Sequence, residues 1–188
     1  FAANGGVKLL EGNLGRSVIK TSAVQEKHYI IEAPAVVIDD QDDLKPLFEA
    51  GELDKDCIVV VRFQGPAANG MPELHKLTPM LGVLQDKGYK IALVTDGRVS
   101  GASGKVPAAI HLVPEASQGG LLAKIHNGDV IRLDATTGVL SALVDQDVLS
   151  SRVAAVAPVV PRTIGRQMFA NNRNAVSSAE EGASSLFS

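Results

Sequence analysis

The chain has 188 residues, 45% hydrophobic and 21% charged, a composition that permits one globular domain with a substantial core. The net charge of −3 and the absence of Trp argue against a nucleic-acid surface, which needs clustered cations or stacking rings. No apolar run approaches the ~20 residues that span a membrane, no signal peptide is visible, and the single Cys57 can form no internal disulfide. We therefore expect a cytoplasmic protein that contacts neither nucleic acid nor membrane.

Runs of β-branched and other apolar residues, bounded by Gly, Pro and acidic residues, predict strands along the chain. Two of these runs, 57–63 and 90–95, are almost entirely apolar, which predicts strands buried on both faces. The sequence Thr136-Thr137-Gly138 lies between two other runs and predicts a hairpin. The remaining predicted strands are 17–21, 29–32, 35–38, 108–113, 129–134 and 139–144.

The predicted helices are fewer than the strands. An acidic run at 39–43 is typical of a helix N-terminus and precedes a predicted helix at 44–50. Pro72 is placed at the start of a predicted helix that continues to Leu84 and connects the two buried strands as a parallel crossover. Further helices are expected at 145–156 and around 166–171.

These elements predict an α/β fold, rich in strands and barrel-like. We expect the main domain to cover residues 1–160, and residues 161–188 to form a peripheral helix and a loose tail. The chain begins with Phe rather than Met, so we also expect it to be part of a longer or processed protein.

Two Gly-rich loops, 64–73 and 96–105, each follow a buried strand. Because α/β sheets place ligands at the carboxyl ends of their strands, these loops are the candidate site. If the strands are neighbours, a carboxylate (Glu73), a guanidinium (Arg98) and a hydroxyl (Ser100) converge. The glycine spacing matches neither a phosphate-binding Walker loop nor a nucleophile elbow, and composition alone indicates only an anion or sugar-acid site.

The second loop carries a longer motif. Residues 95–101 read T-D-G-R-V-S-G, which resembles the T-D-G-R-x-S-G signature of the dihydroxy-acid and 6-phosphogluconate dehydratase family. Four further segments resemble that family in the same order along the chain. They are Gly12-Asn13-Leu14, Gly65-Pro66 with Gly70-Met71-Pro72-Glu73, His111 to Ala116 with Gly119-Gly120, and Asn127 to Ile131. The stretches 101–107 and 165–169 are similar to the phosphogluconate branch rather than to the branched-chain amino-acid branch.

The resemblance implies the C-terminal part of an enzyme that dehydrates 6-phospho-D-gluconate to 2-dehydro-3-deoxy-6-phosphogluconate in the Entner–Doudoroff pathway. It implies a swivelling β/β/α barrel with a C-terminal helical appendage, and a homodimeric parent. The implied cofactors are an iron–sulfur cluster and a divalent metal, commonly Mg²⁺. The cluster ligands would lie in an N-terminal domain that this chain lacks, so this fragment alone would be inactive; Cys57 matches no cluster motif and is interpreted as core packing.

Roles for single residues follow, two from the resemblance (Ser100 and Glu73) and three from side-chain chemistry (Arg98, Ser103 and Lys105), and most have a structural alternative. Ser100 corresponds to the family's proposed base, or is a turn hydroxyl. Glu73 corresponds to a metal ligand, or is a first-turn helix carboxylate. Arg98 would pair with the substrate carboxylate, or form a structural salt bridge. Ser103 and Lys105 would bind the phosphate, although Lys105 is also typical of a solvated lysine.

Three other residues and two other functions remain open. His111 and His75 are candidate general acids, although His111 lies between apolar residues and is also typical of a core histidine. Asp96 is interpreted as a turn residue that fixes its loop. The parent enzyme could instead act on another sugar acid or on a branched-chain dihydroxy acid, and the isolated chain could be a non-catalytic anion-binding domain.

Overall fold

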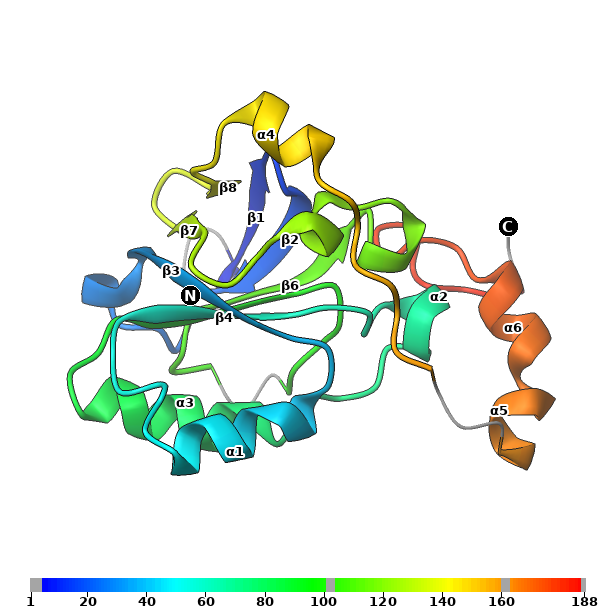
Figure 1. The fold of residues 1–188 in the computed structure, drawn as a ribbon, viewed down its shortest axis with the longest axis horizontal. Coiled ribbons are helices and arrows are strands. Elements are labelled where there is room, and N and C mark those ends of the chain that lie inside the picture. Colours follow the sequence, from blue (N-terminus) through cyan, green and yellow to red (C-terminus); the bar gives the residue numbers. More distant parts are fainter. Residues whose placement is uncertain (1–4, 101–103, 160–162, 187–188) are drawn as a thin grey trace.

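The computed structural model describes residues 5–100, 104–159 and 163–186, and its strands close into one barrel (Figure 1). Around the barrel the order is β1 (Val7–Gly12), β2 (Gly15–Lys20), β6 (Ala108–Val113), β5 (Ile91–Thr95), β4 (Cys57–Val61), β3 (Ile30–Ile38), β7 (Val130–Asp134) and β8 (Val139–Ala142). The domain is therefore mixed α/β, with an eight-stranded closed barrel, as the barrel-like α/β prediction required.

Strand direction divides the barrel into two parts. Strands β3, β4, β5 and β6 are parallel neighbours, and β4 and β5 pair from Cys57↔Ile91 to Val61↔Thr95. The parallel crossover predicted between the two buried strands is confirmed. The other pairs are antiparallel, apart from β1 and β8, which close the barrel through Glu11↔Val139. The carboxyl ends of β4 and β5 consequently lie side by side at one edge.

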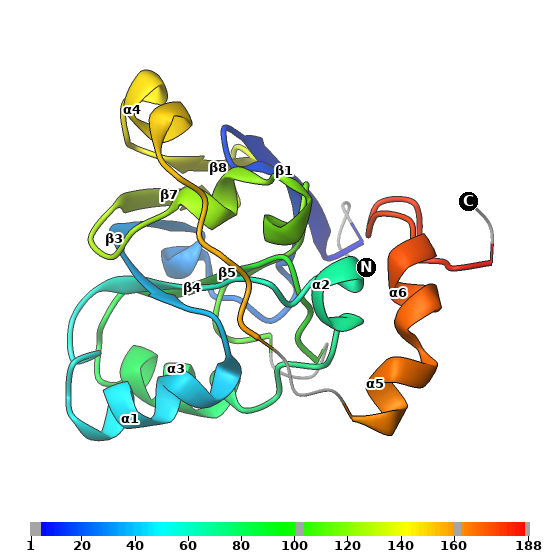
Figure 2. The same ribbon diagram turned by 45° about the vertical axis from the view of Figure 1, so that its right-hand side comes forward.

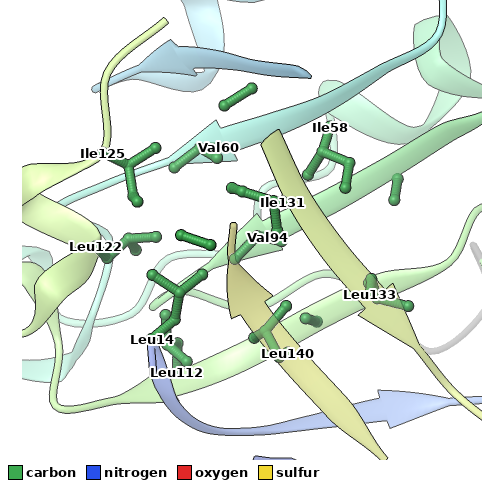
Figure 3. Packing of buried hydrophobic residues seen from close by; sticks show 14 of the residues in the cluster. Leu14, Ile58, Val60, Val94, Leu112, Leu122, Ile125, Ile131, Leu133 and Leu140 are labelled. Atoms are coloured by element: carbon green, nitrogen blue, oxygen red, sulfur yellow. The ribbon is translucent and has the colours of Figure 1, made fainter. Parts of the chain in front are cut away.

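Helices α1 (Leu44–Glu49) and α3 (Leu77–Asp86) cover the outer face of the parallel part (Figures 1 and 2). Alternate residues of β4 separate two cores: Ile58 and Val60 point into the barrel, whereas Val59 packs with Leu81 of α3. Figure 3 shows part of the inner core, to which all eight strands contribute alongside loop residues. This double coverage explains why the sequence of β4 is apolar throughout.

Several predicted boundaries were wrong. The runs at 29–32 and 35–38 form one strand, β3, because Pro34 lies where pairing changes from β7 to β4 and its missing N–H interrupts neither ladder. The helix expected from Pro72 begins only at Leu77. Before it, the Leu74 N–H donates to the Arg98 carbonyl at 3.0 Å, which holds residues 73–74 in a β-bridge instead.

Other differences are insertions or truncations. The predicted loop 64–70 contains a short helix, α2 (Pro66–Asn69), and β1 was not predicted. Helix α4 (Gln146–Ser151) is shorter than expected, since Arg152 leaves the helix and its Nη2 donates to Asp129 at 2.9 Å. The remaining short elements are η1 (Glu26–His28), η2 (Gln41–Asp43), η3 (Ala116–Gln118), η4 (Leu121–Lys124), α5 (Ile164–Met168) and α6 (Ala170–Ala175).

The C-terminal segment runs from α4 along the side of the barrel to α5 and α6, which lie beyond α2 (Figure 2). Its contacts with the rest of the domain include the Ala155 N–H donating to the Ala123 carbonyl at 2.8 Å, and Asn69 of α2, whose Oδ1 accepts a hydrogen bond from Arg166 Nη1 at 2.8 Å. Within the described ranges, none of the helices has both the length and the apolar character needed to cross a membrane.

Candidate functional site

The site forms where the loops after β4 and β5 meet. Because Val61 and Thr95 are paired at the ends of their strands, the two loops leave the same edge together. They remain paired further on, through the parallel bridge Glu73↔Arg98. Two residues that the sequence placed 25 positions apart are therefore neighbours in one rigid frame.

Glu73 and Arg98 face each other across this bridge. Arg98 Nη1 lies 3.7 Å from Glu73 Oε2, and Arg98 Nε donates to the Met71 carbonyl at 3.0 Å. The side chains are 45% and 40% exposed, so water screens their ion pair and each group can exchange its partner for a ligand at little expense in free energy. The arrangement offers a carboxylate for a cation beside a guanidinium for an anion.

Ser100 lies two residues beyond Arg98 and is half-buried, at the end of the described part of its loop. Ser103 lies outside the described residues. The structure thus brings Glu73 and Arg98 into contact and places Ser100 on the same loop as Arg98.

Lys105 is placed differently. Its Nζ lies 2.6 Å from Asp86 on α3, and its aliphatic stem lies against Gly82 of the same helix. The structure pairs Lys105 with Asp86 rather than with the residues at Glu73.

Two histidines lie close to this frame. His111 on β6 donates its backbone N–H to the Gly97 carbonyl at 2.9 Å and has φ of 57°, a strained value for a residue with a side chain. Burial, together with the positive charge of Arg98, lowers the pKa of the His111 imidazole, so the ring is neutral at pH 7. His75 is exposed, and its Nδ1 lies 3.3 Å from the Glu73 carbonyl oxygen.

A buried carboxylate, Asp96, stands behind the exposed residues. It is 0% exposed, and its two oxygens accept backbone N–H groups from Phe63, Gln64 and Ala116. Burial raises the pKa of Asp96 to about 6, although these hydrogen bonds favour the charged form. The sequence indicated a turn role for this residue, but its bonds reach two other loops. An acid directly after a nearly all-apolar strand was the available signal.

Glu73 is the candidate metal ligand at this edge of the barrel. Glu73 offers a hard oxygen of the type that Mg²⁺ prefers, and Mg²⁺ is commonly held by one or two protein carboxylates with substrate and water. No group of three or more His, Cys, Asp or Glu suited to a metal occurs among the residues described. Glu73 alone would therefore fit a shared Mg²⁺ site, in which the other ligands come from substrate, water or the rest of the parent protein.

Cys57 does not fit an iron–sulfur cluster. It is the only cysteine of the sequence, lies fully buried in β4, and packs against the helices. Burial raises the pKa of the Cys57 thiol to about 11, whereas cluster ligands are thiolates. Any cluster would have to be bound by residues outside this chain.

Comparison with known proteins gives a consistent assignment. A family model described as dihydroxy-acid/6-phosphogluconate dehydratase C-terminal matches residues 1–183. The chain is 59% identical to a phosphogluconate dehydratase of Pseudomonas aeruginosa and 57% identical to one of Escherichia coli, with 99% of this chain and 31% of each relative covered. A dihydroxy-acid dehydratase of Wolinella succinogenes is 33% identical over 97% of this chain and 33% of its own length. The chain thus spans about a third of the length of the curated relatives it matches.

Proposed function

The chain belongs to the dihydroxy-acid/6-phosphogluconate dehydratase family, and we propose that it is the C-terminal part of a hydro-lyase acting on 6-phospho-D-gluconate. The observation that carries the choice of substrate is the difference in identity: 57–59% to two phosphogluconate dehydratases against 33% to a dihydroxy-acid dehydratase. The product would be 2-dehydro-3-deoxy-6-phosphogluconate, formed with water in the Entner–Doudoroff pathway of the cytoplasm.

In this proposal Ser100 is the base. It removes the proton from C2, beside the substrate carboxylate, while the hydroxyl leaves C3 with its bonding electrons; the enol then tautomerises to the 2-keto acid. A serine hydroxyl is a weak base, so the reaction needs positive charge near its oxygen and near the carboxylate. Bound metal would supply that charge and Lewis acidity toward the leaving hydroxyl.

Glu73 and Arg98 would bind opposite charges. Glu73 would contribute one oxygen to Mg²⁺, and Arg98 would turn its planar fork toward the substrate carboxylate. Their 3.7 Å ion pair supports this division, because it shows the two groups next to each other in an exposed contact that is easily exchanged.

Ser103 and Lys105 remain the proposed phosphate ligands. Lys105 would have to exchange Asp86 for the phosphate, and both partners are exposed, with side chains 51% and 69% accessible. The exchange would therefore break only a screened surface ion pair.

The proposed partners are the N-terminal domain of the parent enzyme and a second copy in a homodimer. A C-terminal apolar strip supports the first partner. It consists of Val153, Val156, Val159, Ile164, Met168 and Phe169, which are between 56% and 98% exposed. Clustered exposed apolar residues in one stretch of sequence are typical of a surface covered by protein, and the relatives contain about twice as much further chain as the part matched here.

We further propose that residues 1–160 form a swivelling domain and residues 161–188 its helical appendage. The segment that carries these residues leaves α4, passes α2 and continues to α5 (Figure 2). Closure against the N-terminal domain would then bring Glu73, Arg98 and Ser100 to the iron–sulfur cluster and exclude water.

The test uses the intact parent enzyme, prepared anaerobically, with 6-phosphogluconate, gluconate and a branched-chain dihydroxy acid as substrates. We expect turnover of the phosphorylated substrate, and a loss of at least 100-fold in kcat for Ser100→Ala at unchanged iron content. Ser151→Ala, at an exposed serine of α4, is the matched control and should keep its rate. A Ser100→Ala loss below tenfold would remove the base assignment, and an enzyme that ignores 6-phosphogluconate would overturn the substrate.

A further inference from the structure

We propose that Asp96 and Glu115 form a pair of positioning residues that lock three loops of the site into one frame. The catalytic consequence of this inference rests on the proposed function, but the structural part does not. Both residues are buried, with exposed fractions of 0% for Asp96 and 7% for Glu115, whereas the Arg98 side chain is 45% exposed.

Asp96 connects the loops that follow β4, β5 and β6. From its place after β5, its Oδ1 accepts the Gln64 N–H at 2.9 Å, and its Oδ2 accepts the Phe63 N–H at 3.2 Å and the Ala116 N–H at 2.9 Å. A carboxylate is acceptor-only when ionised, so all three bonds are satisfied only by the charged form. Charged acceptors also form stronger bonds than neutral ones.

Glu115 makes the corresponding contacts from the loop after β6. Its Oε1 accepts the Ala67 N–H at 3.0 Å, and its Oε2 accepts the Ala68 N–H at 3.1 Å and the Ser117 hydroxyl at 3.0 Å. The loop that leads to Glu73 is therefore held at four successive points by two acids, through residues 63, 64, 67 and 68.

Two glycines lie so close to neighbouring loops that a Cβ atom would not fit. A Cβ at Gly65 would lie 2.3 Å from Glu115 Oε2, and a Cβ at Gly97 would lie 2.7 Å from the Gln64 Cβ. Both glycines have ordinary negative or extended φ angles, so close approach rather than backbone conformation requires them. The first loop is thus packed directly onto the Glu115 carboxylate, and the second loop directly onto the first at Gln64.

Placing two acids together in a buried position is unfavourable by itself. Burial, with a further contribution from the charge of Glu115, raises the pKa of Asp96 to about 6. A neutral side chain would avoid this desolvation, but it could not accept three N–H groups. The chain therefore keeps a destabilising charge at the point where the site loops converge, which is typical of a functional frame.

Asp96→Asn and Glu115→Gln test the inference, because each places an NH₂ group where an N–H donor already points. The amide loses the fewest hydrogen bonds when its NH₂ replaces the oxygen that accepts only one, so Asp96→Asn loses the Gln64 bond and Glu115→Gln the Ala67 bond. Both variants therefore release the loop that carries Glu73. Asp134→Asn is the matched control. Asp134 is 1% exposed and accepts the Thr136 and Thr137 N–H groups at 2.9 Å, but it lies at the opposite end of the barrel, opposite Ile30 at the start of β3.

Three measurements are made on the intact enzyme at equal iron content: kcat and KM, Mn²⁺ affinity by electron paramagnetic resonance, and amide hydrogen exchange. We expect kcat/KM to fall at least 30-fold in Asp96→Asn and about tenfold in Glu115→Gln, and Mn²⁺ affinity to fall at least fivefold in both. Exchange should accelerate at least tenfold across 63–74. In Asp134→Asn the exchange should change only around 130–139, with kcat, KM and Mn²⁺ affinity within twofold of wild type.

A purely structural role would lower the folded fraction but leave these quantities unchanged per folded enzyme, and that result in both site variants would overturn the inference. Unchanged exchange at 63–74 would also overturn it. If wild type does not turn over 6-phosphogluconate, the proposed function fails, while exchange and Mn²⁺ binding still decide the positioning role. If Asp96→Asn does not fold, Glu115→Gln decides alone.

Discussion

Asp134 closes the hairpin between β7 and β8, and its substitution by Asn gives a stability prediction that the structure makes quantitative. Its Oδ1 accepts the N–H groups of Thr136 and Thr137 at 2.9 Å each, and its Oδ2 accepts from Arg132 Nη2 at 2.9 Å. Burial opposes the charge, but the hydrogen bonds from Thr137, Arg132 and Thr136 outweigh it and lower the pKa of Asp134 to about 2. The folded state thus favours the ionised form.

The lowered pKa and the hydrogen bonds of Asp134 imply the same stabilisation. The pKa falls from 3.8 to about 2, and about 1.4 kcal/mol per unit makes the ionised carboxylate worth about 2.5 kcal/mol. Removing the charge from three hydrogen bonds, at roughly 1 kcal/mol each, also gives 2–3 kcal/mol. We therefore expect Asp134→Asn to lower the free energy of unfolding by about 2–3 kcal/mol at pH 7.

The dependence on pH provides the stricter test. A lowered folded pKa gives stability that is complete above the unfolded pKa near 4 and is lost as the pH falls through about 2. The difference between wild type and Asp134→Asn, measured by urea unfolding of this chain, should be full at pH 5–7 and should shrink steadily from pH 4 to pH 2. A difference below 1 kcal/mol at pH 7, or one that does not change down to pH 2, would refute the reasoning.

Two further predictions follow from the site. Burial, with the charge of Glu115, raises the pKa of Asp96, so its contribution to stability is complete below about pH 4 and is lost as the pH rises through about 6. In urea unfolding between pH 4 and 7, Asp96→Asn should remove this pH dependence of the free energy of unfolding, which is about 3 kcal/mol in total. Lys105→Ala in the intact enzyme should raise KM for 6-phosphogluconate at least fivefold without changing kcat, whereas the control Asp86→Ala should leave KM unchanged. Equal KM values in wild type and Lys105→Ala would refute the phosphate-binding role and leave Lys105 only its ion pair with Asp86.

The parts of the fold that depend on local pattern were predictable. The apolar runs of β4 and β5 and the Thr-Thr-Gly hairpin follow directly from residue type. Closure of the barrel was only outlined, because it depends on contacts such as Glu11↔Val139, far apart in sequence. Helix α3 was started too early because Pro72 favours a first turn, while the bridge that prevents it is formed by Arg98 on another loop.

The same distinction applies to the site. Convergence of the two loops was predicted from the rule that ligands lie at strand ends, and the pairing of β4 with β5 meets its condition. The ion pair of Lys105 with Asp86 was not predicted, since 19 residues separate them in the sequence. The hydrogen bonds of Asp96 with Phe63 and Ala116 were missed for the same reason. A residue that fixes only its own turn and one that also binds other loops have the same local sequence.

The Glu73↔Arg98 bridge means that the two proposed ligand residues would move together. Because the two residues are joined by backbone pairing and by the loops that Asp96 and Glu115 hold, a rigid movement of this domain would deliver the cation ligand and the carboxylate ligand together. Substituting Glu73 should then weaken metal binding without loss of anion binding, and substituting Arg98 should do the reverse. Loosening the frame should weaken both at once. Parallel loss in the frame variants, against separate losses in the two ligand variants, is what distinguishes a positioned pair from two independent surface residues.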